Sequence, residues 1–572
     1  MTNAEIAAVL GELADLLEFQ GANSFRVRAY RQAARTVEAC PESLADRHGD
    51  PARPLTDLPG IGADLAGKIG QLLDSGRIDL LEQLRAALPP TVLDLLRVPG
   101  LGPKRAAQLY KELGIATLDQ LREACESQRI RGLKGFGAKT EDTIAAGIAV
   151  ALQSQQRILW CEAEQIVVPL IRHLSDSATT RQLAAAGSFR RGKDTVGDLD
   201  LLAVAGDGET LMDRLAAYPG VEIVLARGDT KMSVRCRGTQ IDLRVVPEES
   251  YGAALQYFTG SKEHNILLRH RAKQHGLKIN EYGVFRDEQY IAGRTEEEVY
   301  AALGLPWIPP ELREARSEFE WADAGALPAL IEAGDLRGDL HAHTDWSDGL
   351  NTIAEMAEAA RARGLGYLAI TDHSQRVSMA GGLDADRLRR QWDEIDRLNA
   401  RWSDFTLLRG IEVDILERGG LDLPDDVLAG ADWVVASVHY GQRQPREQIT
   451  RRIVDALAHP AVCAIAHPTG RMLLRRDAYL VDLDAVFEAA RAHGKLLELN
   501  AHPNRLDLDD LACAAAKARG VGIVISSDAH NTEGMGVVRY GILQARRAGL
   551  VAADVANTAP WPELKRRLGR AR

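Results

Sequence analysis

The chain has 572 residues, of which 45% are hydrophobic and 26% are charged, and its formal net charge is −11 at pH 7. At about 100–200 residues per domain, this length predicts several domains and excludes a single hydrophobic core. No apolar run approaches the ~20 residues that span a bilayer, and the N-terminus is acidic, so we expect a cytoplasmic protein without a membrane segment. Six scattered cysteines without a C-x-x-C pair favour reduced thiols over a disulfide or zinc-finger framework.

Three short glycine motifs, LPGIG at 58–62, VPGLG at 98–102 and LKGFG at 133–137, share one pattern and precede segments with helical spacing. Two glycines at this spacing permit a tight turn, and backbone N–H groups at the start of the next helix can bind a phosphate. Ordinary helix connections would explain one copy. Three copies with basic residues after them resemble helix-hairpin-helix motifs and favour a DNA-backbone contact despite the acidic net charge. The candidate DNA-binding residues are Gly60, Gly62, Lys68, Gly100, Gly102, Lys104, Gly135 and Gly137.

Paired carboxylates define a first candidate catalytic site. Asp198 and Asp200 are two residues apart in the strand-like run DLDLLAV, so a strand directs both side chains to one face. Asp242, in the strand-like segment TQIDLRVV, supplies a third carboxylate. Such carboxylates repel one another unless they share cations, and Mg²⁺ prefers carboxylate and phosphate oxygens. Two ions held there would activate an attacking oxygen and stabilise a leaving pyrophosphate, whereas the alternative is a turn with solvated acids.

The segments GSFRRGKDTVGDLDLL, IDLR and YFTGSKEHNILLRHRAKQHGLKINEYGVF (257–285) resemble the family X DNA polymerases. The resemblance covers about residues 1–315 and implies Mg²⁺ ligation and catalysis by Asp198, Asp200 and Asp242. It also implies triphosphate, sugar and nascent-base-pair contacts by Ser188, Arg191 and Gly197, by Tyr257, Phe258 and Gly260, and by Asn265 and Arg269, respectively. Lys68 falls on the position of the family's lyase lysine. Arg26 and Asp64 replace lysines of the eukaryotic phosphate-binding cluster, which leaves lyase activity open.

From residue 336, short apolar strands alternate about seven times with Ala/Arg-rich helices, which predicts a barrel of parallel strands. His and acidic residues follow these strands, at the end where barrel enzymes place their chemistry. One such His is usually a packed or surface imidazole, but nine coincident candidates favour a metal centre. The candidates are His341, His343, Asp348, His373, Glu412, His439, His467, Asp528 and His530. Left outside this set are His459, His493 and His502, while Asp372 either orients a ligand or binds no metal.

This pattern, which begins with HAHTDWSDG at 341–349, resembles the PHP domain, a superfamily of trinuclear metal phosphoesterases, over about residues 336–572. The resemblance implies three ions, held respectively by His341, His343, Glu412 and Asp528, by Glu412, His439 and His467, and by Asp348, His373 and His530. Manganese is the expected metal, and these ligands also suit zinc or iron. Arg471 and Arg505 are candidates to neutralise substrate phosphate, and Trp346 and Tyr440 are candidates to stack an unpaired base.

The expected fold is multidomain, α+β followed by α/β. It comprises a lyase-like helical domain (1–80), helix-hairpin-helix fingers (81–150), a nucleotidyltransferase palm (151–245), a thumb (246–315), a linker (316–335) and a distorted seven-stranded (β/α) PHP barrel (336–572). We expect a monomeric, nucleoid-associated DNA repair enzyme that binds gapped or nicked DNA and dNTP. It would fill short gaps and process 3′ ends as a 3′→5′ exonuclease, with AP endonuclease activity left open. The alternatives are a small-molecule nucleotidyltransferase fused to a PHP phosphatase, and a DNA-end-binding scaffold.

Overall fold

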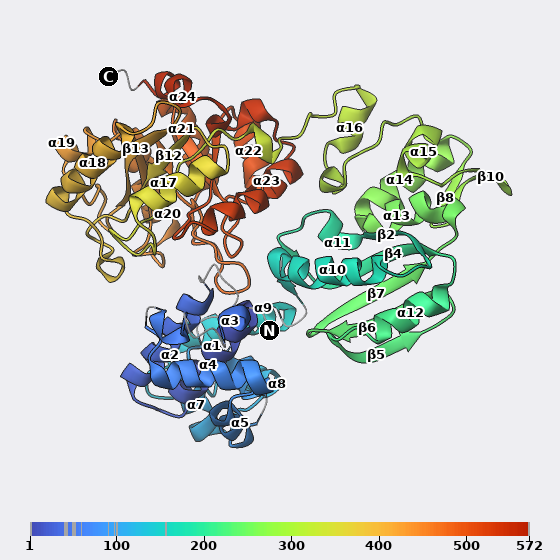
Figure 1. Cartoon of the computed structure of the whole chain (residues 1–572), viewed down its shortest axis with the longest axis horizontal. Helices are drawn as coiled ribbons and strands as arrows, with labels where there is room; N and C mark the ends of the chain where they lie inside the picture. The colour runs from blue at the N-terminus through green and yellow to red at the C-terminus, as the bar shows by residue number, and fades with distance from the viewer. Residues whose placement is uncertain are drawn as a thin grey trace. The chain divides into compact units, whose positions relative to one another are not determined.

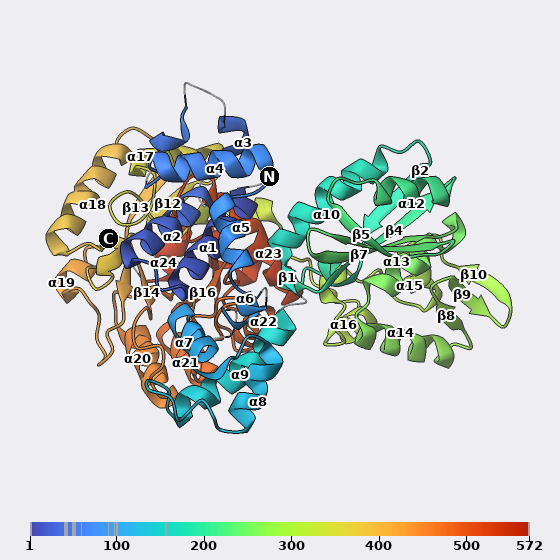
Figure 2. The same cartoon turned by 90° about the horizontal axis from the view of Figure 1, so that it is seen from below.

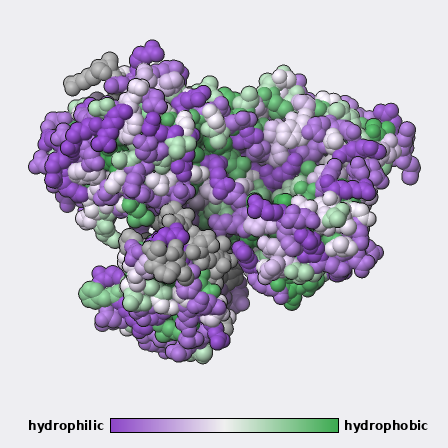
Figure 3. Space-filling model, in the orientation of Figure 1, coloured by the Kyte–Doolittle hydropathy of each residue, from purple (hydrophilic) through white to green (hydrophobic). Residues whose placement is uncertain are grey.

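The computed structural model describes residues 3–38, 44–48, 53–58, 60–89, 91–96, 98, 101–154 and 157–569 (Figure 1). Internal contacts divide the chain into two compact units, Met1–Gln155 and Gln156–Arg572. Gly100, one of the predicted DNA-binding residues, lies outside the described residues. Among the described helices, none combines the length and apolar character needed to cross a membrane. Figure 3 shows hydrophilic residues over most of the visible face, with hydrophobic ones dispersed among them.

The first unit is helical. Its elements are α1 (Asn3–Phe19), α2 (Ser24–Glu38), α3 (Leu44–Arg47), η1 (Leu55–Asp57), α4 (Ala63–Ser75), α5 (Asp79–Ala86), α6 (Val92–Leu96), α7 (Pro103–Leu113), α8 (Leu118–Glu126) and α9 (Ala138–Ser154). Apolar side chains of α1, α2, α4 and α5 form one core, and those of α6 to α9 form another.

The three glycine motifs adopt the same turn, as predicted. In each copy, the apolar residue between the two glycines donates its backbone N–H to the carbonyl three residues earlier, at 3.0 Å. The buried residues in this position are Ile61, Leu101 and Phe136. The first glycine has a positive φ in the two described copies, +75° at Gly60 and +87° at Gly135, which favours glycine over any other residue. A helix follows at once in all three copies: α4, α7 and α9.

The second unit begins with a five-stranded sheet in the order β2-β4-β7-β6-β5. Its elements are β1 (Ile158–Leu159), α10 (Trp160–Ser175), β2 (Thr180–Ala185), α11 (Gly187–Arg190), β3 (Thr195–Val196), β4 (Asp198–Ala205), α12 (Gly208–Ala216), β5 (Val221–Arg227), β6 (Lys231–Cys236) and β7 (Thr239–Val245). Helices α10 and α12 pack on the sheet face that carries Leu199, Leu201 and Ala203. Because side chains alternate along a strand, Asp198 and Asp200 lie on the opposite face.

A mixed segment follows the sheet. It contains η2 (Glu248–Ser250), α13 (Tyr251–Thr259), α14 (Lys262–Gln274), β8 (Lys278–Asn280), β9 (Gly283–Arg286), β10 (Gln289–Ala292), α15 (Glu296–Ala302), η3 (Pro310–Leu312) and α16 (Glu318–Asp323). Its three strands form an antiparallel sheet. Glu296 links this segment to α11, since it accepts two hydrogen bonds from Arg190, and it accepts one more from Arg313 within the segment.

The rest of the unit is a nearly closed barrel of seven parallel strands in sequence order, which confirms the predicted architecture. Its strands are β11 (Gly338–Asp339), β12 (Tyr367–Ile370), β13 (Thr406–Asp414), β14 (Trp433–Ser437), β15 (Ala464–Ile465), β16 (Leu496–Asn500) and β17 (Ile523–Ser526). The N–H of His343 donates to the carbonyl of Ala529 at 2.8 Å and so links the two ends of the sheet.

Helices surround the barrel (Figure 2). They are η4 (Ala333–Asp335), α17 (Ile353–Ala362), η5 (Ser378–Ala380), α18 (Ala385–Asn399), α19 (Asp425–Leu428), α20 (Arg446–Ala458), α21 (Leu483–His493), α22 (Asp510–Ala518), η6 (Gly534–Val537), α23 (Val538–Arg547), η7 (Ala552–Asp554), η8 (Ala556–Thr558) and α24 (Trp561–Arg567). Trp561 and Leu564 of α24 join the interior core of Tyr367, Leu408 and Val435. Apolar packing therefore fills the part of the barrel interior that lies away from the carboxyl ends of the strands.

Candidate metal centres

Strand pairing brings the three predicted catalytic aspartates together. Strands β4 and β7 are parallel neighbours, and Asp200 is in register with Asp242. Asp198 lies two residues before Asp200 and therefore shares its face of the sheet. The structure thus places all three carboxylates on the sheet face that α10 and α12 leave open.

The electrostatics of this triad favour a bound cation. Burial and the neighbouring carboxylates of Asp198 and Asp242 raise the pKa of Asp200 to about 6. Burial alone would also raise the pKa of Asp242, but hydrogen bonds, first among them that of Lys231, outweigh it and lower that pKa. The Lys231 Nζ lies 2.6 Å from Asp242 Oδ2. A divalent ion would relieve the remaining repulsion, so the donor set fits Mg²⁺.

The raised pKa of Asp200 predicts a gain in stability on its neutralisation. Without metal, the fold disfavours the ionised carboxylate, so the cost appears as pH rises from about 4 to about 6 and is complete above that range. We expect Asp200→Asn to stabilise the metal-free protein by ~2 kcal/mol at pH 8, with the gain fading as pH falls from about 6 to about 4. Thermal melts in EDTA against pH measure this, with the exposed Asp229→Asn, in the hairpin between β5 and β6, as control. A destabilised Asp200→Asn protein at pH 8 would contradict it.

The segment before the triad approaches it closely. Gly187 has φ +62°, and a Cβ atom there would collide with the Asp200 carboxylate, so this position requires glycine. Ser188 lies in α11 and Arg191 follows it, while Gly197 directly precedes β4. The Arg191 guanidinium donates from Nε to Glu314 Oε1 at 3.1 Å and from Nη1 to the Thr259 carbonyl.

The residues predicted to meet the sugar and the base pair lie on α13 and α14. Tyr257 and Phe258 contact edge to face with ring centroids 5.1 Å apart, and Asn265 Nδ2 donates to the Tyr257 carbonyl at 2.8 Å. Gly260 ends α13 with φ +67°, and Arg269 is exposed on α14. Arg244, which the sequence did not single out, lies two residues after Asp242 and places its guanidinium 4.3 Å from the Phe258 ring.

In the first unit, the two predicted basic DNA contacts differ in environment. Lys104 is exposed in the first turn of α7. Lys68 forms an ion pair with Asp64 and lies 5.9 Å from the Tyr30 ring. Burial alone would lower the pKa of Lys68, but the hydrogen bond with Asp64 and the nearby Tyr30 outweigh it and raise that pKa. The protonated form is thus stabilised, which disfavours the neutral amine that Schiff-base chemistry requires.

In the barrel, too, the candidate ligands are placed by the two-residue period of side chains along a strand. Alternate residues of each strand face the interior, and they change from apolar to polar toward the carboxyl end. In β13 and β16, these interior residues are Leu408, Gly410, Glu412 and Asp414, and Leu496, Glu498 and Asn500. Two ligand positions, His467 and Asp528, have positive φ values of +29° and +54°. Such backbone strain is common at functional sites.

Eight of the nine predicted ligands fall into three overlapping groups whose ligand atoms lie within 4.8 Å of one another. These groups are His343, Asp348, His373 and His530; His341, His343 and Asp528; and His373, Glu412 and His439. The ninth, His467, places Nε2 3.0 Å from Glu412 Oε1. The grouping differs from the predicted one. His343 and His373 each belong to two of these groups, whereas Glu412 belongs to one, together with His373 and His439.

The chemistry of these side chains fits bound metal. Within the described part of the chain, His341 Nε2 and both ring nitrogens of His343 are buried without a well-directed hydrogen bond. Carboxylate oxygens of Glu412 and Asp528 lie 3.2–3.8 Å from the Nε2 atoms of both rings. Burial and the neighbouring His530 and His373 lower the pKa of His343 to about 4. It therefore remains a neutral imidazole, which is the form that binds metal.

Two carboxylates that the sequence analysis missed orient the ligands. Glu498 Oε1 lies 2.7 Å from His341 Nδ1, and its Oε2 accepts the backbone N–H of His467 at 2.7 Å. Asp414 Oδ1 lies 3.1 Å from His439 Nδ1. Carboxylates in this position fix the tautomer and direction of a ligating imidazole. Their signal in the sequence was the two-residue spacing Glu412–Asp414 and Glu498–Asn500 at strand ends.

We expect Glu498→Gln to lower manganese affinity about 10–100-fold, because it removes the charge that orients His341. Metal content after dialysis, with titration of manganese into the stripped protein, measures the effect. The exposed Glu358→Gln serves as control. Full metal retention in Glu498→Gln would show that the carboxylate does not support ligation.

The remaining candidates take other positions. Asp372 accepts hydrogen bonds from Thr344, Ser347 and Gln391, so it braces the loop after His343 and lies outside the three ligand groups. Arg505 Nε lies 3.7 Å from Asp528 Oδ2. Arg471 donates instead to the Leu506 carbonyl. It also forms an ion pair with Asp194, which directly precedes β3.

The aromatic candidates and the remaining histidines lie outside the three ligand groups. Trp346 Nε1 donates to Glu394 at 3.2 Å, and Tyr440 lies beneath the Arg376 guanidinium at 4.4 Å. His459 pairs with Asp425, and His493 is exposed at the end of α21. His502 lies near Arg505, and burial with that charge lowers its pKa to about 4.

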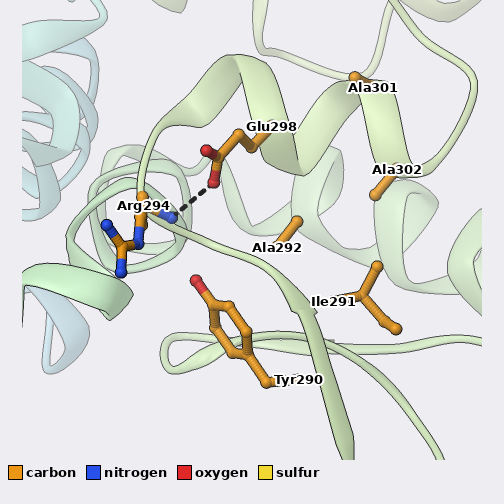
Figure 4. A pocket seen from close by; sticks show the side chains of 7 residues that line it. All are labelled: Tyr290, Ile291, Ala292, Arg294, Glu298, Ala301 and Ala302. Carbon is orange, nitrogen blue, oxygen red and sulfur yellow. Dashed lines mark hydrogen bonds between the residues drawn. The ribbon is translucent and has the colours of Figure 1, made fainter.

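A pocket of about 490 Å³ lies away from both centres, between β10 and α15 (Figure 4). Its lining residues are Tyr290, Ile291, Ala292, Arg294, Glu298, Ala301 and Ala302. The Arg294 backbone N–H donates to Glu298 at 3.0 Å. None of the predicted ligands or substrate-binding residues lines it.

Two separate groups of candidate metal ligands on one chain are typical of a metal-dependent phosphoryl-transfer enzyme with two centres. The chain is 41% identical over 563 residues to the DNA polymerase/3′-5′ exonuclease PolX of Bacillus subtilis (strain 168), covering 97% of each. It belongs to the PolX family, the family X DNA polymerases with a C-terminal PHP domain.

Matches to parts of the chain agree with this family. Family models match a helix-hairpin-helix domain at residues 1–78, a SAM-like helix-hairpin-helix tandem at 92–149, a DNA polymerase beta thumb at 254–314 and a PHP domain at 339–502. DNA polymerase lambda of Rattus norvegicus is 27% identical over 346 residues, 54% of this chain and 56% of that protein. A probable phosphatase of Thermoanaerobacter sp. (strain X514) is 31% identical over 231 residues, 38% of this chain and 89% of that protein.

Proposed function

We propose that this chain fills short gaps in DNA by templated nucleotide addition and removes nucleotides or blocked groups from 3′ ends at its second centre. The observation that supports the proposal is the presence of two separate groups of candidate metal ligands, one on the five-stranded sheet and one at the carboxyl rim of the barrel. The Bacillus subtilis relative is named for both activities. Repair of short gaps is a role in which addition and 3′ processing act on the same DNA.

In the polymerase centre, Asp198, Asp200 and Asp242 would hold Mg²⁺, which when bound activates the attacking oxygen and neutralises charge on the leaving pyrophosphate. Gly187 lets the backbone approach Asp200. We assign triphosphate binding to Ser188, Arg191 and Gly197, sugar contacts to Tyr257, Phe258 and Gly260, and base-pair contacts to Asn265 and Arg269. Arg269 is exposed on α14, so its side chain is accessible to a DNA strand.

In the barrel centre, the nine ligands would hold up to three ions, with manganese as the leading candidate over zinc and iron. Bound there, the metal supplies a nucleophile at neutral pH and clamps phosphoryl oxygens. Arg505 is the arginine we assign to the substrate phosphate, because its Nε lies 3.7 Å from the ligand Asp528. The internal partners of Arg471 make that residue a poorer candidate.

The helix-hairpin-helix turns would bind the DNA backbone through Gly60, Gly62, Gly102, Gly135 and Gly137. Their shared geometry presents backbone N–H groups at the start of a helix. Lys104 and Lys68 add positive charge beside two of these turns. Contacts of this kind position DNA without reading its sequence.

The experiment that tests the function uses one DNA substrate with a short gap and a labelled primer. With all four dNTPs and Mg²⁺, we expect the primer to extend by the length of the gap, with incorporation directed by the template. With manganese and no dNTP, we expect the primer to shorten from its 3′ end. If neither change occurs while nucleotide is transferred to a small molecule, the small-molecule alternative replaces this proposal.

A further inference from the structure

Helix α23 of the barrel packs against residues 187–194, here called the 187–194 loop. Gln544 Nε2 donates to the Gly192 carbonyl at 3.0 Å, and Arg547 Nη1 donates to the Arg191 carbonyl at 2.7 Å. Both side chains are at most 3% exposed. The loop that carries two of the assigned triphosphate residues is therefore held through its backbone by side chains more than 350 residues away in sequence.

The packing around these hydrogen bonds is tight. Gly192 has φ +68°, and a Cβ atom there would lie 2.5 Å from Leu543 Cγ, so Leu543 occupies the space of a side chain. Trp160 stacks on Phe189 of the loop with ring centroids 4.7 Å apart, and Tyr540 meets the edge of Trp160 at 5.8 Å. Tyr540, Leu543, Gln544 and Arg547 follow one face of α23 at helical spacing. One helix face thus supports the loop over much of its length, and α23 lies beside α10 in Figure 2.

A shared carboxylate extends this support to the Arg191 side chain. Glu314 Oε1 accepts from Arg191 Nε at 3.1 Å and from Arg547 Nη1 at 2.9 Å. Burial alone would raise the pKa of Glu314, but Arg547 and Arg191 outweigh it and lower that pKa. Arg547 also donates to Asp510 at 2.8 Å. If Arg191 turns toward a triphosphate, Arg547 still neutralises Glu314, so the exchange leaves no buried charge unpaired.

We propose that α23 is a positioning element for nucleotide binding in the polymerase reaction, with Arg547 and Gln544 as its positioning residues. They fix the carbonyls of Arg191 and Gly192 and so hold Ser188 and Arg191 where the triphosphate binds. This inference rests on the proposed polymerase function of the aspartate centre. The barrel thereby contributes to nucleotide affinity without touching the nucleotide.

Steady-state insertion of one nucleotide into gapped DNA by the full chain tests this proposal. Arg547→Lys loses the paired donors, and Gln544→Met keeps the volume but loses its donor. We expect each to raise the KM for dNTP about 10-fold, with kcat within about 3-fold, because the loop is displaced but the metal triad is not. Arg566→Ala is the matched control, since it is an exposed arginine of the barrel that donates to the Pro562 carbonyl in its own helix α24. We expect its KM to match that of the unchanged chain.

A purely structural role would lower the active fraction and therefore kcat, without a selective rise in KM. An unchanged KM in both variants, with normal extension by the unchanged chain, would overturn the inference. No extension by the unchanged chain would instead contradict the polymerase function. If Arg547→Lys fails to fold, as seen by circular dichroism, the uncharged Gln544→Met variant decides the outcome through KM and through the Kd of a fluorescent dNTP analogue.

Discussion

Replacement of both Asp198 and Asp200 by Ala is expected to lower primer extension on gapped DNA by about 10³-fold or more, while 3′ removal continues. The reason is local: these side chains share one sheet face with Asp242 and lie in a different sheet from every barrel ligand. Loss of both carboxylates removes the cation site and the charge that draws Mg²⁺ to the β4–β7 pair. Extension and shortening of one labelled primer, measured in separate reactions, report the two activities.

Asp229→Ala is the matched control, because Asp229 is an exposed acid in the hairpin between β5 and β6 of the same sheet. We expect it to extend the primer normally. Parallel loss of extension and 3′ removal in the double variant, with its fold intact, would mean that the two centres are not independent.

Replacement of His343 by Ala is expected to have the converse effect. His343 belongs to two of the three ligand groups and is fully buried, so its loss weakens two metal positions at once. We expect manganese-dependent 3′ removal to fall about 10³-fold or more, with primer extension retained. The labelled primer, incubated with manganese and without dNTP, measures the change.

His493→Ala provides the comparison for this variant, since His493 is an exposed histidine at the end of α21 and lies in none of the ligand groups. Normal 3′ removal is expected from it. If His343→Ala retained both its metal and its 3′ removal, the barrel rim could not be the nuclease centre.

The two-residue period of strands made much of both centres predictable. Asp198 and Asp200 were identifiable because a strand needs only local spacing to place them on one face, and Asp242 because it interrupts a similar apolar run. The nine barrel candidates stood out because each follows a strand-like run. In these cases a local pattern determines the direction of a side chain, and the sheet then brings the directions together.

Residues that act through distant contacts carried a weaker signal in the sequence. Glu498 reads as part of the apolar strand LLELN, and its role appears only when β16 brings it to His341, 157 residues away. Gln544 and Arg547 read as the polar face of an ordinary helix. Their contact with the 187–194 loop depends on how the barrel packs against the part of the chain that holds the five-stranded sheet. No local stretch of sequence shows that packing.

The grouping of the barrel ligands also depended on three-dimensional detail. The resemblance assigned each histidine to one ion, whereas the structure places His343 and His373 between neighbouring groups. The positive φ of Asp528 turns its carboxylate toward His341 and His343, a backbone state that an aspartate seldom adopts and that its neighbours in sequence do not reveal.

Anomalous X-ray scattering from crystals of the manganese-loaded protein tests the central claim most directly, because it locates the ions without reference to activity. We predict peaks within coordination distance of Asp198, Asp200 and Asp242, and a separate cluster of peaks among the histidines and carboxylates of the barrel rim. Ions confined to only one of these places, or bound at unrelated surfaces, would contradict the presence of two metal centres on this chain.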